Sequence, residues 1–285
     1  MVDFTTKRFV TPDGVTLVAD VGGPPDAPTV ILSHGGGQTR HSWAKAAQEL
    51  AARGYQVINV DMRGHGESDW APDGLYTLEA GARDLRTIIT AANRPVALVG
   101  ASMGGILSFY TIGSSETPIV DALVLVDIVL RPALEGRNRI QTFMRANPGG
   151  FATIEEAADA VAAYNPSRPR PNDPSGLMRN LRLRDDGRLY WHWDPRLLDA
   201  KPGVEPPERV DALVGVARNV IVPTLLVRGG HSDVVDEEGI EEMKQLVPQT
   251  EVLEVGGAGH MVAGDRNDAF NQGVIDFLER HMPAR

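Results

Sequence analysis

Short apolar runs rich in β-branched residues alternate in this chain with longer amphipathic stretches. The runs have the length and composition of buried strands, and the stretches have the spacing of helices. The first strands are predicted at 29–33, 56–60, 96–100 and 122–126, with helices at 43–53, 78–92 and 104–113. Before them, a turn sequence at 12–14 separates two segments that we expect to form an antiparallel hairpin. This alternation is typical of βαβ units, so it predicts an α/β fold with a mostly parallel sheet.

The alternation stops at about residue 128 and resumes at about residue 220. The later part carries strands predicted at 220–227 and 251–255, and helices at 237–246 and 269–281. The interval 128–219 instead combines helical patterns with a proline-rich segment and a predicted hairpin. It carries 14 Lys and Arg against 12 Asp and Glu, whereas the rest of the chain carries 14 against 26. We therefore expect an α/β core made of 1–127 and 220–285, and a mainly helical cap, 128–219, inserted into it as a lid.

Charge and cysteine content exclude several classes of function. The formal net charge of −10 argues against nucleic-acid binding, which needs a cationic face. The chain has no cysteine, which excludes disulfides, thiolate metal sites and a cysteine nucleophile. The most apolar stretch, 119–130, contains two aspartates and is too short to span a bilayer. The first ten residues lack the apolar core of an export signal, so we expect a cytoplasmic protein without membrane insertion.

The segment 100–104, with the sequence GASMG, has the G-x-S-x-G spacing of a nucleophile elbow. It follows a predicted strand and precedes a predicted helix, which is the context that this motif requires. In so tight a turn, Gly100 and Gly104 remove side chains that would collide. The serine hydroxyl is then exposed beside a helix N-terminus that favours negative charge. Ser102 is the candidate nucleophile, and the alternative is a glycine-rich turn that only packs a helix against the sheet.

This elbow and its context resemble the α/β-hydrolase family, in particular its serine esterases and lactonases with an inserted cap. The segment 33–37, SHGGG, follows a predicted strand at the place where the family has its oxyanion loop. The resemblance implies that Gly36 and Met103 supply the N–H groups of the oxyanion hole, with Gly37 as an alternative donor. A phosphate-binding glycine loop is the other interpretation, but the segment lacks the Lys-Ser/Thr ending of a P-loop.

The resemblance also implies a histidine base late in the chain. Of the seven histidines, only His260 lies in a glycine-flanked loop after a late predicted strand. Its alternative role is to cap the last helix. Asp61 and His65 lie in a segment, 61–68, that is similar to a family segment at the rim of the active site. We therefore expect Asp61 and His65 to be structural.

Two carboxylates are candidates for the acid that orients the base. Asp233 follows the predicted strand 220–227 and preserves the family order of serine, acid and histidine. Asp127 ends the predicted strand 122–126, a position that some family members use instead. Asp233 is therefore the preferred candidate, and Asp127 is the alternative. His231, with Asp233 and His260, is too sparse a set to predict a metal site, and none is expected.

Aromatic and basic residues of the cap are candidates for the substrate pocket. Trp191 and Trp193 lie on one face of a predicted strand because side chains alternate along strands. With Phe143 and Trp43 they are candidates to line an apolar pocket, and cap packing is the alternative. Arginines between 168 and 188 are candidates to bind an anionic substrate or form a solvated face.

The resemblance implies a hydrolase for a small carboxylic ester or lactone that works through an acyl-enzyme, without metal or organic cofactor, as a monomer or homodimer. Epoxide hydrolases and haloalkane dehalogenases need a carboxylate nucleophile, and Ser102 argues against both. Cofactor-free haloperoxidases (perhydrolases) and C–C bond hydrolases are the enzymatic alternatives. A ligand receptor on the same fold is the alternative outside catalysis.

Overall fold

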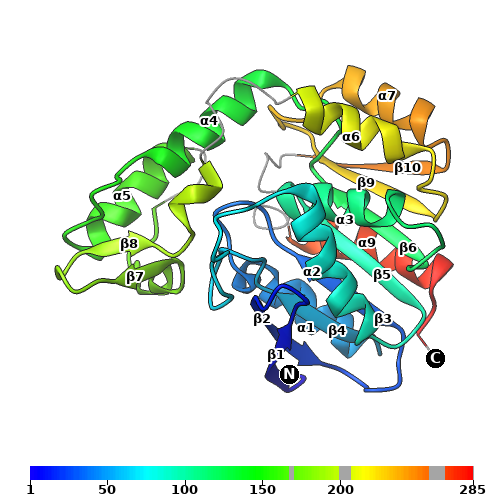
Figure 1. The fold of residues 1–285 in the computed structure, drawn as a ribbon, viewed down its shortest axis with the longest axis horizontal. Coiled ribbons are helices and arrows are strands. Elements are labelled where there is room, and N and C mark those ends of the chain that lie inside the picture. Colours follow the sequence, from blue (N-terminus) through cyan, green and yellow to red (C-terminus); the bar gives the residue numbers. More distant parts are fainter. Residues whose placement is uncertain (167–169, 199–206, 257–266, 285) are drawn as a thin grey trace.

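The computed structural model describes residues 1–166, 170–198, 207–256 and 267–284. Its centre is an eight-stranded sheet with the strand order β1-β2-β4-β3-β5-β6-β9-β10 (Figure 1). The strands are β1 (Phe4–Val10), β2 (Thr16–Gly22), β3 (Thr29–Ser33), β4 (Gln56–Val60), β5 (Val96–Ala101), β6 (Ala122–Val126), β9 (Thr224–Gly229) and β10 (Thr250–Val255). β2 pairs antiparallel with both β1 and β4, and all other neighbours pair in parallel. The α/β fold with a mostly parallel sheet is confirmed.

Helices cover both faces of this sheet. The helices beside the sheet are α1 (Ala44–Ala52), α2 (Leu78–Thr90), α3 (Met103–Gly113), α6 (Pro207–Ala217), α7 (Glu237–Leu246) and α9 (Asn267–His281). α1 and α9 pack on the face that carries Val30 and Val99. The other four pack on the face that carries Ile31 and Leu98. Because successive strand residues point to opposite faces, the continuous apolar runs of the sequence supply both layers of the core.

The strand register brings the expected site to one edge of the sheet. Ala101 of β5 pairs with Val126 of β6, and Ser33 of β3 pairs with Gly100 of β5. The segments that follow β3, β5 and β6 therefore leave the sheet side by side at its carboxyl edge. In open α/β sheets this edge faces the ligand crevice.

Most of the segment between β6 and β9 forms a separate lobe, drawn green to yellow-green on one side of Figure 1. Its elements are α4 (Leu134–Arg145), α5 (Ile154–Tyr164), η2 (Ser175–Asn180), β7 (Leu181–Leu183), β8 (Leu189–Trp191) and η3 (Pro195–Leu198). The lobe has its own apolar cluster, which includes Met144, Phe151 and Trp191. α6, in contrast, packs on α3, where Val216 contacts Gly113 and Leu213 joins the core. We call the lobe 134–198 the cap from here on, and we propose that α6 belongs to the core.

The part of the chain described here contains no helix that is long and apolar enough to cross a membrane.

Candidate active site

Ser102 occupies a sharp turn between β5 and α3. Its backbone has φ 45° and ψ −114°, a conformation that non-glycine residues rarely adopt. A Cβ on Gly100 would lie 2.5 Å from the backbone of Gly104, and one on Gly104 would lie 2.4 Å from the carbonyl oxygen of Ser33. Both positions therefore admit only glycine, as the elbow motif predicts. The turn directs the chain from the sheet edge into α3, with Ser102 as the residue that precedes the helix.

The loop that follows β3 lies against this turn. The N–H of Gly35 donates to Oε1 of Gln38, and the N–H of Gly37 donates to Nε2 of His65 over 3.0 Å. The N–H groups of Gly36 and Met103 donate to no acceptor among the described residues. Gly36 and Met103 thus keep free donors on this side, whereas the alternative donor Gly37 is already occupied by His65.

Three buried histidines hold this loop by hydrogen bonds to backbone. Nε2 of His34 accepts from Met62 N–H, so its Nδ1 carries the proton and donates to Gly35 O. His65 accepts from Gly37 N–H at Nε2 and donates from Nδ1 to Arg63 O. Each ring is a neutral donor and acceptor. Burial lowers the pKa of both imidazoles from 6.5 to about 3.

The third histidine, His192, comes from the cap and reaches both core loops. Its Nδ1 accepts from Gly66 N–H over 2.7 Å, and its Nε2 lies 3.4 Å from Gly37 O. Its ring lies 5.7 Å from that of His65, which in turn lies 5.0 Å from that of His34. Burial lowers the pKa of His192 to about 3 as well. The rings of His192, His65 and His34 therefore lie next to one another, between the cap and the candidate oxyanion loop.

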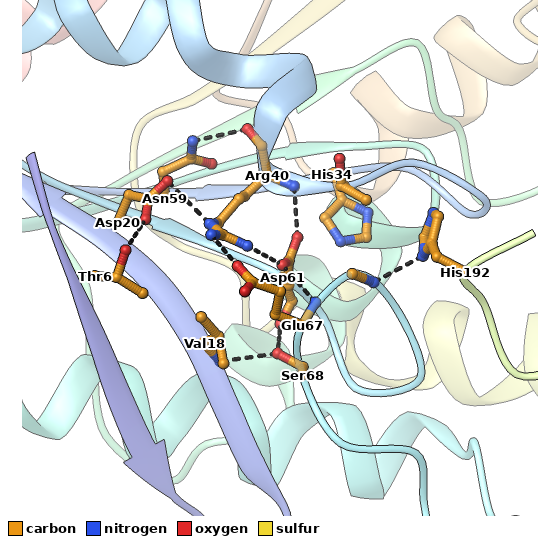
Figure 2. Close-up of polar contacts among 12 residues, drawn as sticks. Thr6, Val18, Asp20, His34, Arg40, Asn59, Asp61, Glu67, Ser68 and His192 are labelled. Atoms are coloured by element: carbon orange, nitrogen blue, oxygen red, sulfur yellow. Dashed lines mark hydrogen bonds and ion pairs between the residues drawn. The ribbon is translucent and has the colours of Figure 1, made fainter. Parts of the chain in front are cut away.

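A second set of hydrogen bonds and ion pairs that holds these loops is centred on Asp61 and Arg40 (Figure 2). Asp61 is fully buried, and its carboxylate accepts from the N–H of Arg40, the guanidinium of Arg40 and the N–H of Glu67. Arg40 also pairs with Asp20 and Glu67. Burial alone would lower the pKa of Arg40, yet these carboxylates, led by Asp61, raise it above its usual value. These hydrogen bonds support the structural role that the sequence predicts for Asp61 and His65.

The two candidate acids have different environments. Asp127 follows β6 with φ 51° and is 1% exposed. Its Oδ1 accepts from Gly229 N–H over 3.1 Å, and its Oδ2 accepts from the hydroxyl of Ser232 over 2.7 Å. Asp233 instead forms a 3.0 Å ion pair with Arg139, and its side chain is 29% exposed. His260 lies outside the described residues.

A cavity of about 570 Å³ lies between the cap and the carboxyl edge of the sheet. Ser102, Met103, Gly36, Gly37 and Asp127 all line it, and Asp233 is absent from the lining. The cap contributes mostly apolar walls. Its apolar lining residues are Ile140, Phe143, Met144, Val161, Tyr164, Leu177, Trp191, Leu197 and Leu198.

The four aromatic candidates divide between the cavity and the core. Phe143 and Trp191 line the cavity. Trp193 stacks on Trp191 with ring centroids 5.0 Å apart, but β8 ends at Trp191, so the two do not share a strand face as expected. Trp193 packs behind Gly37 and does not line the cavity. Trp43 was expected at the pocket and is instead 2% exposed beneath the sheet, where it contacts Phe270 of α9. That expectation is wrong because α1 begins beside Trp43 and turns the indole toward α9.

Comparison with known proteins identifies the family. A family model described as the alpha/beta hydrolase fold matches residues 28–266. The chain belongs to the α/β-hydrolase family. Esterase Rv0045c of Mycobacterium tuberculosis is 28% identical over 261 residues, which cover 88% of this chain and 83% of that protein. The sn-1-specific diacylglycerol lipase ABHD11 of Mus musculus is 27% identical over 88% of this chain and 81% of its own length.

Solved structures share the fold of this α/β hydrolase. E-2-(acetamidomethylene)succinate hydrolase superposes with a TM-score of 0.82 at 23% identity, covering 97% of this chain and 100% of its own. The crystal structure of Rv0045c superposes with a TM-score of 0.77 at 25% identity, over 97% and 92% of the two chains.

The structure adds residues that the sequence analysis did not single out for a role. His192 was only one of seven histidines, and its partner Gly66 is 126 positions away. Ser232, whose hydroxyl donates to Asp127, directly precedes the expected acid Asp233. Arg137 of α4 lines the cavity although it lies outside the arginine-rich segment 168–188. Within the described residues, no three histidine, aspartate or glutamate side chains cluster as a metal site would require.

Proposed function

We propose that this α/β hydrolase cleaves a carboxylic ester or lactone, with Ser102 as the nucleophile and an acyl-enzyme as the intermediate. The observation that carries the proposal is the strained turn of Ser102, which lines a cavity together with Gly36 and Met103, whose N–H groups have no acceptor among the described residues. The similarity to an esterase over most of both chains supports it. Backbone strain of this kind is concentrated at functional positions.

In the proposed reaction, the hydroxyl of Ser102 attacks the acyl carbon while His260 takes the hydroxyl proton. The N–H groups of Gly36 and Met103 bind the oxyanion of the tetrahedral intermediate. The intermediate then expels the alcohol, which receives its proton from His260. Water, deprotonated by His260, attacks the acyl-enzyme and releases the acid and the free serine.

For the acid of the triad we propose Asp127 rather than Asp233. Asp127 follows the strand next to that of Ser102 and lines the same cavity, and a buried carboxylate there supports an orienting role for the base. Donors from Gly229 and Ser232 hold its two oxygens. Asp233, in contrast, is paired with Arg139 and lies outside the cavity lining.

Hydrolysis of p-nitrophenyl butyrate tests the proposed reaction. We expect a burst of about one p-nitrophenol per chain followed by steady turnover, because p-nitrophenol is a good leaving group and deacylation is then the slower step. Ser102→Ala lowers kcat by at least about 10³-fold with an unchanged melting temperature. Ser115→Ala, at the far end of α3, is the control and keeps the wild-type rate. A protein that binds esters without turnover would contradict the proposal and favour a ligand receptor.

A further inference from the structure

Met144 of α4 lies directly on the candidate oxyanion loop. A Cβ built on Gly36 would lie 3.7 Å from Sδ of Met144, and one built on Gly37 would lie 3.4 Å from its Cε. At the start of the loop, a Cβ on Gly35 would lie 3.5 Å from Cβ of Ser102. The candidate nucleophile and the thioether of Met144 thus both lie against the glycine loop that supplies the proposed oxyanion donor.

The surroundings of Met144 enclose its side chain. Met144 is 9% exposed and belongs to the apolar cluster of the cap, together with Phe151 and Trp191. The next residue, Arg145, donates to the carbonyl oxygen of Leu198 in η3, which joins the end of α4 to the end of the cap. Met144 also lines the cavity that contains Ser102. Because protein interiors are close-packed, a side chain enclosed in this way has little room to move aside for a ligand.

The proposed reaction decides which part of a substrate meets this wall. In the tetrahedral intermediate the acyl carbon carries the oxyanion, Oγ of Ser102, the alcohol oxygen and the acyl chain. The oxyanion accepts from the N–H of Gly36, and the alcohol oxygen has to face the base that protonates it. The acyl chain is the remaining group, so its first carbon is the one that passes Met144. A branch at that carbon would need the space that Sδ and Cε occupy.

We propose that Met144 determines specificity by restricting the substrate to esters whose acyl chain is unbranched at the carbon next to the carbonyl. This inference rests on the proposed esterase reaction and specifies its substrate class. Extra carbon atoms forced into a packed site displace side chains from their preferred positions, which is unfavourable. Past that carbon, an unbranched chain continues along apolar side chains of the cap that line the cavity, such as Phe143 and Leu177.

Two p-nitrophenyl esters, the butyrate and the 2-ethylbutyrate, test the inference because they differ only in a branch at that carbon. Selectivity is the ratio of their kcat/KM values, divided by the ratio of their alkaline hydrolysis rates to remove the intrinsic effect of the branch. Wild type should favour the butyrate by at least about tenfold. A ratio near one, or a preference for the branched ester, would overturn the inference. Because the same active chains hydrolyse both esters, the ratio does not depend on how much of a variant is folded.

Substitutions of Met144 identify the side chain responsible. Met144→Ala removes Sδ and Cε and should lower the ratio to less than about threefold. Met144→Val also lacks these atoms but leaves a smaller cavity, so it gives the same test if the alanine variant does not fold. Met144→Leu, of similar volume, should keep the ratio. Met178→Ala is the matched control, since this cap methionine is 45% exposed and lies outside the described lining. A ratio that neither Met144→Ala nor Met144→Val lowers would show that Met144 only packs the cap.

Binding to the full-length Ser102→Ala variant separates this inference from the proposed function. Calorimetry should show the butyrate ester bound at least about fivefold more tightly than the branched ester, and adding Met144→Ala should remove the difference. Hydrolysis of both esters by wild type without preference refutes only the inference. A binding difference that depends on Met144, in a chain that hydrolyses neither ester, supports the wall at Met144 and refutes the esterase reaction. Neither hydrolysis nor a binding difference refutes both.

Discussion

Ser102 and Asp127 both have a positive backbone φ, of 45° and 51°, which is uncommon for residues other than glycine. Each is the first residue after a buried strand, and the two strands, β5 and β6, pair in parallel. A non-glycine residue in such a conformation costs about 1–3 kcal/mol. The fold retains this strain at two adjacent strand ends, and both residues line one cavity. Their shared geometry favours a nucleophile and its acid acting through one base.

Exchange of each candidate acid for its amide tests this pairing. Asp127→Asn should lower kcat for p-nitrophenyl butyrate by about 10³–10⁴-fold, because an amide holds the base in the wrong tautomer. Asp233→Asn should leave kcat within about threefold, since that carboxylate lies outside the cavity lining and pairs with Arg139 on the surface. Circular dichroism of both variants controls for folding. The opposite ranking would assign the acid to Asp233 and make Asp127 structural.

Three loops, which follow β3, β4 and β8, are joined through His34, His65 and His192. Each imidazole accepts one backbone N–H, so protonation would break a bond that the loop needs. The folded pKa of about 3 lies below the 6.5 of an unfolded histidine. Above pH 6.5 neither state binds the proton, so these histidines leave stability independent of pH. Between pH 6.5 and about pH 3 only the unfolded state binds these protons, so the free energy of unfolding falls as the pH is lowered through this range.

The free energy of unfolding should therefore decrease with acidification below pH 6.5. Each of the three histidines contributes up to about 1.4 kcal/mol per pH unit to this slope. His192→Gln should remove one such contribution between pH 6 and pH 4.5, measured by urea unfolding. His281→Gln, on the surface of α9, is the control and keeps the wild-type slope. If His192→Gln and wild type lose stability in parallel, His192 is not buried in its neutral form.

On the scale of the whole molecule, the apolar runs predicted the sheet well. β3, β4 and β6 begin and end where the sequence analysis expects, because each run is continuous and follows a turn or polar segment. The role of α6 was not predictable in this way. Its pattern is that of an amphipathic helix, and its place beside the core rests on contacts between distant segments, such as those of Val216 with Gly113 of α3.

The site was predictable where a motif has a local physical reason. The elbow at Ser102 is such a motif, since the close approach of Gly100 and Gly104 requires glycine. The choice between Asp127 and Asp233 depends on which strand end lies beside β5. Whether the N–H of Gly37 is available depends on His65, which comes from another loop and accepts a hydrogen bond from it. Contacts between distant segments leave no pattern in a single sequence.

The cap is fastened to the core through a buried carboxylate, Asp194. It is 0% exposed, accepts from the hydroxyl of Tyr76 over 2.6 Å and pairs with Arg196. Its own N–H donates to Gly64 O, and Arg196 donates to Ala71 O. These bonds join the end of the cap hairpin to the loop after β4, so they fix the cap above the cavity.

Tyr76→Phe should weaken this attachment. It removes the bond to Asp194 and the one that the hydroxyl accepts from Ala71 N–H, so unfolding free energy should fall by about 1–3 kcal/mol. Tyr110→Phe is the matched control, because its hydroxyl bonds the exposed Glu79. We expect that variant to change stability by less than about 0.5 kcal/mol in urea unfolding. Equal losses in the two variants would mean that the Asp194 contact does not hold the cap.

The central claim is that Ser102 is the nucleophile of an esterase, and covalent trapping tests it most directly. Diethyl p-nitrophenyl phosphate phosphorylates activated serines and should release about one p-nitrophenol per chain. Intact-mass and peptide analysis should then find one diethylphosphoryl group, located on Ser102 and absent from Ser102→Ala. A chain that hydrolyses esters yet remains unlabelled, or carries the group on another residue, would contradict the account.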